Sequence, residues 1–344
     1  MFLMKKHYRH IDVLKGIFIL VVIFEHAKWP LSFWQKTGMP FWDRMAIPCF
    51  MTISGFLYTR SIEKGTIEDY YSFKNIAHKL KRYLLPYSFV FLLELILWFI
   101  VSVPSVREAI RQNFQYELSF DPNIRLTFRE LFHLYLIGGE GPGNYYTPVL
   151  VQLIFIFPLL YLFIKKYGYK GLLASAGFCF LAELWQYLFH IPRTTYRILI
   201  LRHIMTICFG IYLALGYYKK NIILNFLSLC TGIAYIIAHS YHRWTPVFFN
   251  NGWADVNFVA CLYFCPIIAL LLSKEKMHFK PLEQIGKASY HIYLTQMIYY
   301  NFVKRVIAIQ YFKSPYLWCF VSTIICTIIG LCFCQLENRL RKRL

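Results

Sequence analysis

The sequence predicts an all-α fold: a polytopic transmembrane helical bundle of about ten spans, in a single domain over residues 1–344. Hydrophobic residues make up 58% of the chain and charged residues only 16%, and the mean hydropathy is +0.45. A soluble chain usually carries about 25% charged residues. Apolar runs about as long as a bilayer is thick recur along the chain, and basic residues gather in every second connection between them.

Ten apolar runs define the expected spans. They occupy residues 11–29, 42–59, 84–103, 147–165, 171–190, 198–217, 222–239, 254–273, 287–303 and 315–335. The ninth run is the weakest because it contains Lys287, His291 and Gln296. We expect His291 and Gln296 to make interhelical hydrogen bonds. Aromatic residues, at 19%, are typical of a protein with Tyr and Trp belts at both membrane interfaces.

The basic residues predict that both termini are cytoplasmic. With the N-terminus inside, the cytoplasmic connections hold Lys5, Lys6, Arg9, the basic loop 60–82, Lys165, Lys166, Lys170, Lys219, Lys220, Lys274, Lys276, Lys280 and the tail from Arg339 to Arg343. This alternation follows the positive-inside rule and explains most of the formal charge of +20. We therefore expect a multi-pass protein of the inner (cytoplasmic) membrane. Nucleic-acid binding is not expected, because the charge is dispersed between spans rather than gathered on one face.

The external loop 104–146 carries the clearest local signal outside the apolar runs. Thr127 and Glu130 form a capping box, which predicts a short helix through about Ile137. The Gly-rich segment 138–144 ends that helix, and the loop could lie over the external mouth of the bundle. Neither a metal site nor a disulfide framework is expected, because the ten cysteines lie almost entirely within apolar runs and lack metal-type spacing.

Polar residues inside the first apolar run are the main functional signal. Lys15 and His26 are eleven residues apart, which is about three helical turns and about 16 Å along one face of a helix. Asp12 lies one turn before Lys15 on that face, close enough to pair with it. Ionisable groups at membrane depth are functional candidates by default. Because the run contains Lys15, Glu25 and His26, it is also not a cleavable signal peptide.

The chemistry of these side chains favours a role for His26 as a general base over that of a packed polar residue. A histidine near its ordinary pKa can deprotonate a hydroxyl as the hydroxyl attacks a thioester. Glu25 points about 100° away on the helix and need not contact the ring. For Lys15 three interpretations stay open: holding an acyl-CoA phosphate, pairing with Asp12, or snorkelling to the cytoplasmic interface.

Several stretches in chain order resemble the acyltransferase-3 family of membrane-bound acyltransferases, whose members O-acylate carbohydrates and peptidoglycan. The stretches are Ile11-Asp12-x-x-Lys15-Gly16 followed by Val21-Val22-x-x-x-His26, Pro48 to Leu57 with Ser54-Gly55, Lys81-Arg82 to Pro86-Tyr87, Gly143-Asn144-Tyr145-Tyr146 to Gln152, and Ile285-Gly286-Lys287 to Leu294. Three positions depart from the family pattern. Many members have Arg at Lys15 and His at Gln296, and a small residue is usual at Glu25.

The resemblance implies an O-acyltransferase that moves an acyl group, expected to be acetyl, from acyl-CoA to a hydroxyl of a cell-envelope glycan or lipid-linked saccharide. Acetyl-CoA would be a co-substrate rather than a bound cofactor, and the partners would be this donor, the carbohydrate acceptor and the lipid bilayer. The catalytic candidates are His26 and Lys15. The candidates for binding acyl-CoA or substrate are Asp12, Glu25, Ser54, Arg82, Asn144 and Tyr145.

Plainer interpretations remain beside these. Ser54-Gly55 is more typical of close helix packing than of a catalytic serine, and positive-inside topology alone accounts for Arg82. The sequence assigns no role to Glu94, Glu183, Asp255 or His203, which also lie within or at the edge of apolar runs. A transporter or flippase of a lipid-linked saccharide is the alternative function, although no internal repeat supports it. The sequence reveals neither the acceptor nor the oligomeric state, and it does not distinguish direct transfer from an acyl-enzyme.

Overall fold

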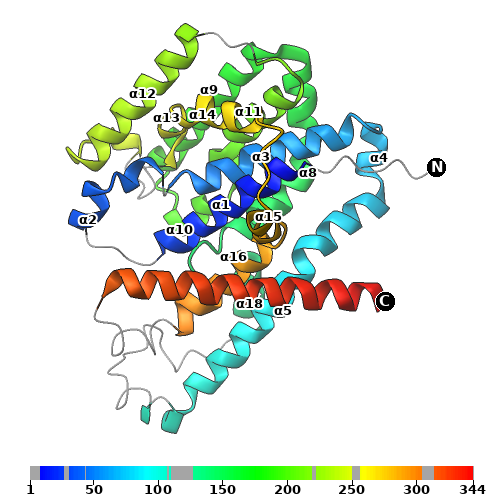
Figure 1. The fold of residues 1–344 in the computed structure, drawn as a ribbon, viewed down its shortest axis with the longest axis vertical. Coiled ribbons are helices and arrows are strands. Elements are labelled where there is room, and N and C mark those ends of the chain that lie inside the picture. The colour runs from blue at the N-terminus through cyan, green and yellow to red at the C-terminus, as the bar shows by residue number, and fades with distance from the viewer. Residues whose placement is uncertain are drawn as a thin grey trace.

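The computed structural model describes residues 8–26, 31–42, 44–106, 108–109, 127–218, 222–249, 256–303 and 314–343, and in these ranges it contains helices and no strand (Figure 1). The elements are α1 (Arg9–Glu25), α2 (Leu31–Lys36), η1 (Met39–Phe41), α3 (Ala46–Ile62), α4 (Ile67–Tyr71), α5 (Phe73–Ser102), α7 (Phe128–Leu136), α8 (Tyr146–Tyr167), α9 (Tyr169–Leu188), α10 (Arg193–Arg197), η2 (Ile200–His203), α11 (Ile204–Ala214), α12 (Ile222–Ser240), η3 (Val247–Phe249), α13 (Phe258–Cys261), α14 (Phe264–Leu272), α15 (Lys280–Lys287), α16 (Ser289–Ile298), the π-helical η5 (Tyr299–Val303) and α18 (Pro315–Arg343).

Five of the described helices are long and apolar enough to cross a membrane: α5, α8, α9, α12 and most of α18. Helices α1 and α3 have 17 residues each, and α11 has 11. The eighth predicted run is divided into α13 and α14, and the ninth into α15, α16 and η5. An all-helical membrane protein is therefore confirmed in the described ranges, whereas the count of about ten spans stays a prediction.

The outward faces of the long helices are apolar, as contact with lipid requires. On α12, Ile222, Ile223 and Leu224 are 83%, 70% and 63% exposed. On α5, α9 and α18 the same holds for Phe99, Leu173 and Phe320. Such a surface would be unfavourable in water, and hydrocarbon provides the environment that it needs.

Close backbone contacts at glycine join α1 to α15 and α3 to α11. A Cβ atom on Gly16 would lie 2.2 Å from the carbonyl oxygen of Leu282, and one on Gly286 would lie 1.8 Å from that of Asp12. On the second pair, a Cβ atom on Gly55 would lie 2.3 Å from the carbonyl oxygen of Ile207. Small residues at these crossings let the helices approach more closely than any side chain permits. The crossing of α1 and α15 fixes the helix that ends at His26.

The predicted helix in loop 104–146 is confirmed as α7. The Thr127 hydroxyl accepts from the backbone N–H of Glu130, and the Glu130 side chain accepts from the backbone N–H of Thr127. These two bonds hold a helix that is otherwise exposed. The pKa of Glu130 lies below its ordinary value, because the backbone N–H and the hydroxyl of Thr127 both donate to its carboxylate and so favour the ionised form. Residues 110–126 of the loop lie outside the described ranges.

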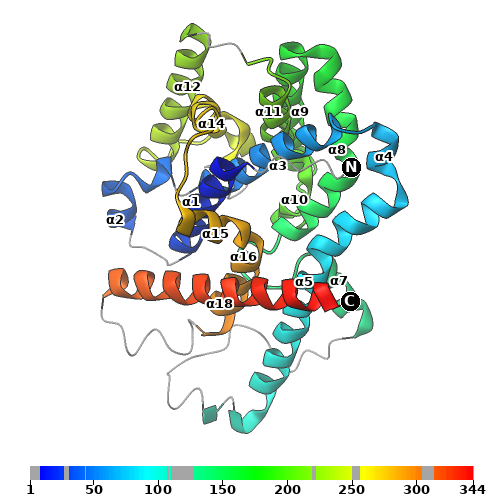
Figure 2. The same ribbon diagram turned by 45° about the vertical axis from the view of Figure 1, so that its right-hand side comes forward.

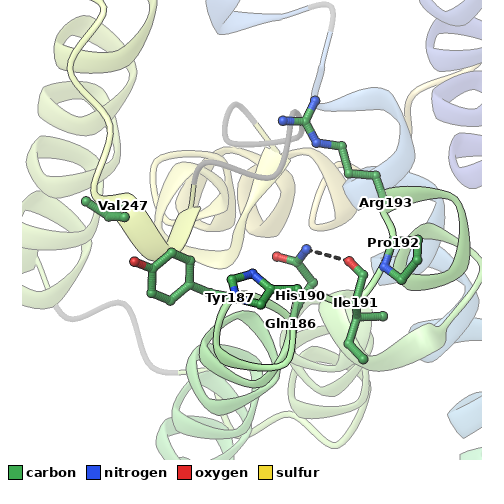
Figure 3. A pocket seen from close by; sticks show the side chains of 7 residues that line it. All are labelled: Gln186, Tyr187, His190, Ile191, Pro192, Arg193 and Val247. Carbon is green, nitrogen blue, oxygen red and sulfur yellow. Dashed lines mark hydrogen bonds between the residues drawn. The ribbon is translucent and has the colours of Figure 1, made fainter.

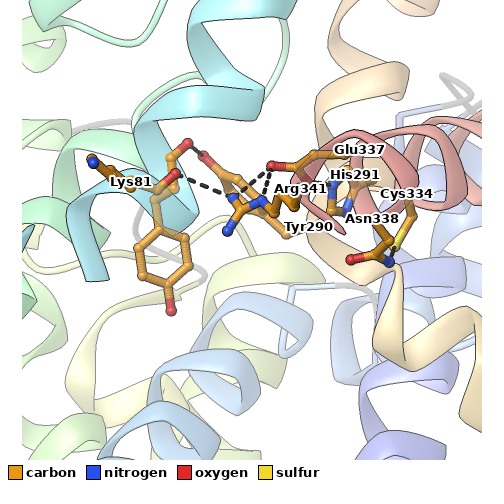
Figure 4. Close-up of polar contacts among 8 residues, drawn as sticks. Lys81, Tyr290, His291, Cys334, Glu337, Asn338 and Arg341 are labelled. Atoms are coloured by element: carbon orange, nitrogen blue, oxygen red, sulfur yellow. Dashed lines mark hydrogen bonds and ion pairs between the residues drawn. The ribbon is translucent and has the colours of Figure 1, made fainter. Parts of the chain in front are cut away.

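A polar network ties α18 to α16 and α5, and Figures 1 and 2 show α18 lying across α5. Nε2 of His291 lies 2.5 Å from Oε2 of Glu337, and Arg341 donates to the same carboxylate. Arg341 also donates to the backbone carbonyl of Lys81 at 3.3 Å (Figure 4). The prediction of an interhelical bond for His291 is thereby confirmed.

Candidate active site

His26 follows directly after α1 and is half-buried. The Tyr300 ring meets the imidazole at an angle of 67°, with ring centroids 6.0 Å apart. The Tyr300 hydroxyl donates to the backbone carbonyl of Ile23 at 2.8 Å, which holds this ring against α1. The Tyr300 ring therefore forms an aromatic wall on one side of His26, and its orientation is fixed by this hydrogen bond.

The Gly-rich loop 138–144 lies close to the imidazole. A Cβ atom on Gly143 would lie 3.9 Å from Nε2 of His26 and 3.9 Å from Nε2 of Gln296. Gly143 has φ +82°, a left-handed conformation that glycine adopts without steric cost. The Tyr293 hydroxyl donates to the Gly143 carbonyl at 2.8 Å and so fixes its position. The missing side chain at Gly143 leaves space beside His26.

Two buried amide side chains lie beside this space with free acceptor oxygens. Asn144 and Gln296 are 2% and 0% exposed. Nδ2 of Asn144 donates to the Gly139 carbonyl at 2.6 Å, and Nε2 of Gln296 donates to the Pro142 carbonyl at 3.4 Å. Their oxygens, Oδ1 and Oε1, are buried and accept no hydrogen bond from the described residues. A buried acceptor without a donor costs about 1–3 kcal/mol, which a ligand hydroxyl could offset.

A carboxylate on α5 holds the loop from its other side. Oε1 of Glu94 accepts from the backbone N–H of Glu140 and from Nδ2 of Asn301, each at 3.2 Å. Gly139 has φ +81°, and a Cβ atom there would lie 2.6 Å from Oε2 of Glu94. Glu94 has no assigned role in our sequence interpretation, although an isolated carboxylate in an apolar run is a signal that could have found it.

Glu25 and Tyr145 lie next to this group and have contacts of their own. Oε1 of Glu25 forms an ion pair with Arg44 at 2.8 Å. Tyr145, 6% exposed, stacks on His203 with ring centroids 6.3 Å apart and planes at 7°. Neither contact involves the imidazole of His26.

Lys15 pairs with Asp12 through an Nζ–Oδ1 distance of 2.7 Å. Of the three interpretations of Lys15, the ion pair is the one that the structure displays. The pair lies where Gly16 and Gly286 bring α1 and α15 together, and Asp12 is 6% exposed. Lys15 therefore carries a partly buried charge about 16 Å along α1 from His26.

Ser54 and Arg82 have contacts away from His26. The Ser54 hydroxyl donates to the Phe50 carbonyl at 2.8 Å, within its own helix. The neighbouring Gly55 packs on α11, so the contacts of this motif are those of helix packing. Arg82 is exposed on α5 and acts electrostatically on Tyr58.

The structure thus brings Asn144 and Tyr145, which directly follow Gly143, into the neighbourhood of His26, which Glu25 directly precedes. It adds Gly143, Gln296 and Tyr300, which the sequence had not placed there. The expected interhelical bond of Gln296 was wrong in its partner, because the amide donates to the carbonyl of Pro142 in a loop. Loop 138–144 and α16 are far apart in sequence, so no local pattern could have paired them.

A histidine beside an open space, with two amide oxygens that are free to accept hydrogen bonds, is an arrangement suited to deprotonating a hydroxyl. The family model described as an acyltransferase domain matches residues 8–334, nearly the whole chain. The chain belongs to the acyltransferase-3 family. This agrees with the motifs that suggested it, and acyltransferase activity follows from the membership. No curated protein and no solved structure shows a significant match to the chain.

Proposed function

We propose that this family member is a membrane-bound O-acyltransferase that moves an acetyl group from acetyl-CoA to a hydroxyl of a cell-envelope glycan or lipid-linked saccharide. His26 is the general base of the reaction. The observation that carries the proposal is the space beside Nε2 of His26, which Gly143 leaves open and which Gln296 and Asn144 line with unused acceptors.

In the proposed reaction Nε2 of His26 takes the proton of the acceptor hydroxyl while its oxygen attacks the thioester carbonyl carbon. The C–S bond then breaks, the protonated imidazole returns the proton to the leaving thiolate, and the products are the ester and free CoA. Oδ1 of Asn144 and Oε1 of Gln296 would accept hydrogen bonds from neighbouring hydroxyls of the saccharide. Such bonds orient the reacting hydroxyl, and orientation supplies much of the rate enhancement.

The proposed arrangement in the membrane follows the charge pattern. Basic connections would place both termini in the cytoplasm of a cell with an inner membrane. The cytoplasmic donor would then approach from the side of Lys15, and the acceptor from the opposite side, where His26 lies. The proton transfer needs His26 to be uncharged at the start.

The test is transfer of radiolabelled acetyl from acetyl-CoA into lipid-linked or polymeric glycan in inverted membrane vesicles. We expect His26→Ala, at matched expression, to lower the rate by at least about a hundredfold, because general base catalysis contributes about 10² to 10⁴. His133→Ala, which removes an exposed histidine on α7, is the matched control and should retain the wild-type rate.

Equal labelling by wild type and His26→Ala would remove His26 from the chemistry. If wild type transfers no label to any supplied envelope glycan, the proposed acceptor class is wrong. The alternative of a transporter or flippase is not favoured, because the family match is to acyltransferases.

A further inference from the structure

Arginines converge on Tyr145, the residue that precedes α8 and directly follows Asn144 of the candidate site. Arg44, Arg197 and Arg202 all act electrostatically on its hydroxyl, and so does Glu25. The arginines come from the segment before α3, from α10 and from η2, so the fold gathers them from three parts of the sequence. The concentration of positive charge is therefore a property of the folded chain and not of any local motif.

Two carboxylates in this neighbourhood are already placed beside other arginines. Glu25 forms its ion pair with Arg44 at 2.8 Å. Glu183 is 1% exposed and, together with the buried Arg202, acts electrostatically on both Cys179 and Tyr196. The cluster thus holds more cationic than anionic side chains.

Arg197 is the cation of this cluster with no carboxylate partner among the described residues. Its Nε is buried and makes no hydrogen bond within the described ranges. Burial lowers the pKa of the guanidinium, so the site itself disfavours the charge that Arg197 carries. An anion bound there would offset this cost, and arginine is suited to carboxylate and phosphate because it donates in a planar fork.

A second buried polar atom lies next to Tyr145. His203 is 4% exposed and stacks on Tyr145, and its Nε2 is buried without a hydrogen-bond partner in the described part of the chain. Buried polar atoms are rarely left unpaired in a folded protein. Arg197 and His203 together therefore indicate a place for a polar ligand beside Tyr145.

Arg197 is the last residue of α10, and the first turn of the same helix borders a cavity of about 300 Å³. Arg193, the first residue of α10, lines it together with Tyr187 and His190, and Figure 3 shows the Tyr187 ring between Val247 and His190. An aromatic ring with a few polar groups is a surface on which a sugar ring can rest. Helix α10 thus carries one arginine at this cavity and another, one turn on, beside Tyr145.

We propose that Arg197 and His203 form an anion subsite for the acceptor, and that the acceptor is an acidic saccharide bearing a carboxylate or a phosphate close to the hydroxyl that is acylated. The cavity lined by Tyr187, His190 and Arg193 holds an adjoining sugar. This inference rests on the proposed transfer to a saccharide and adds the charge class of the acceptor. The subsite selects the acceptor, and His26 performs the proton transfer.

The experiment compares three acceptors of equal glycan length in the purified protein: a neutral disaccharide, the same disaccharide with a uronic acid, and the disaccharide on an isoprenyl diphosphate. Transfer from acetyl-CoA gives kcat/KM, and thermal unfolding with each acceptor alone gives binding independently of transfer. We expect Arg197→Gln to lower kcat/KM for the preferred anionic acceptor by about ten- to a hundredfold, mainly through a higher KM. A loss of this size is typical of one missing charge-assisted hydrogen bond.

The same variant should leave the neutral disaccharide unaffected, and Arg197→Lys should recover part of the loss. Preference for the uronic acid identifies a carboxylate subsite, and preference for the diphosphate identifies a phosphate subsite. Arg129→Gln, which removes an exposed arginine from α7, is the matched control and should behave as wild type. An equal loss with all three acceptors, or no loss, would overturn the subsite.

The binding measurement separates this inference from the proposed function. If wild type binds the anionic acceptor more tightly than the neutral one, and Arg197→Gln abolishes the difference, the subsite stands even where no acetyl is transferred. If wild type transfers acetyl but the neutral disaccharide and both anionic acceptors stabilise the protein equally, the anion subsite is wrong and the acyltransferase remains.

Discussion

Gly143→Ala tests the space beside His26 more sharply than removal of the histidine does. The added methyl would lie 3.9 Å from Nε2 of both His26 and Gln296, and 3.3 Å from Cε2 of Tyr293. A hydroxyl that donates to the imidazole must come within about 2.6–3.2 Å of Nε2. The methyl would occupy the space through which the hydroxyl approaches, while every polar side chain of the site is retained.

The stability cost of this change can be worked from the backbone. Gly143 has φ +82°, and an L-residue in the left-handed region costs about 1–2 kcal/mol. The Tyr293 ring must give way by a few tenths of an ångström, so the whole cost is about 1–3 kcal/mol. We expect a folded protein whose kcat/KM falls about ten- to a hundredfold, as a misplacement of about 1 Å produces.

Gly168→Ala separates the two effects, because Gly168 has φ +55° and no atom within 4 Å of its added methyl. It lies between α8 and α9, at the end of α8 opposite to the loop that contacts His26. Gly168 combines φ +55° with ψ −126°, a conformation close to one that only glycine adopts readily, so thermal unfolding in detergent should show at least as much destabilisation in Gly168→Ala as in Gly143→Ala. The acetyl-transfer assay should show lost activity in Gly143→Ala alone. Wild-type activity in Gly143→Ala, or an equal loss in Gly168→Ala, would refute the reasoning.

Two further substitutions test the assignments of packing. Gly286→Ala should lower the free energy of unfolding by about 3 kcal/mol or more, because its methyl would lie 1.8 Å from the Asp12 carbonyl oxygen and must push α15 from α1. Gly177→Ala lies inside α9 with open space around it and should leave thermal stability equal or slightly higher, because alanine is the better helix former, and equal losses in the two variants would contradict the close contact. Ser54→Ala should retain acetyl transfer within about twofold, since its hydroxyl donates to a carbonyl of its own helix and the bond contributes about 1 kcal/mol. A loss of several orders of magnitude would restore the nucleophile interpretation.

The features that the sequence predicted correctly are those that depend on neighbours in the chain. The capping box at Thr127 and Glu130 forms because its partners are three residues apart. The ion pair of Asp12 and Lys15 forms for the same reason, since one helical turn separates them. Apolar run length likewise indicated helices, because a buried or lipid-facing helix needs continuous apolar residues.

The features that the sequence missed depend on how loops and broken helices meet. The ninth run becomes two helices and a π-helical turn, which bring Gln296 beside loop 138–144 and Tyr300 beside His26. A hydropathy profile shows only a weak span there, because it averages the apolar character of the residues on both sides of the break in the helix. Arg197 was missed for a similar reason. Its neighbours come from distant parts of the chain, Tyr145 before α8 and Arg202 in η2, and the local sequence around Arg197 is that of any arginine in a short connection.

The placement of His26 has a consequence for how the site works as a unit. Helix α1 packs on α3, α15, α16 and α18, so the position of the imidazole is fixed by the bundle. The opposite wall is loop 138–144, whose backbone is held by hydrogen bonds to side chains. The Glu94 carboxylate accepts from the backbone N–H of Glu140, and the Tyr293 hydroxyl donates to the carbonyl of Gly143. One wall is therefore rigid by packing and the other by a few hydrogen bonds. Asn144 is part of this loop and Gln296 donates to it, and each has a buried oxygen that accepts no hydrogen bond from the described residues. A saccharide hydroxyl bound to these oxygens would complete the hydrogen bonding of the loop, so the saccharide would help to assemble the site in which it reacts.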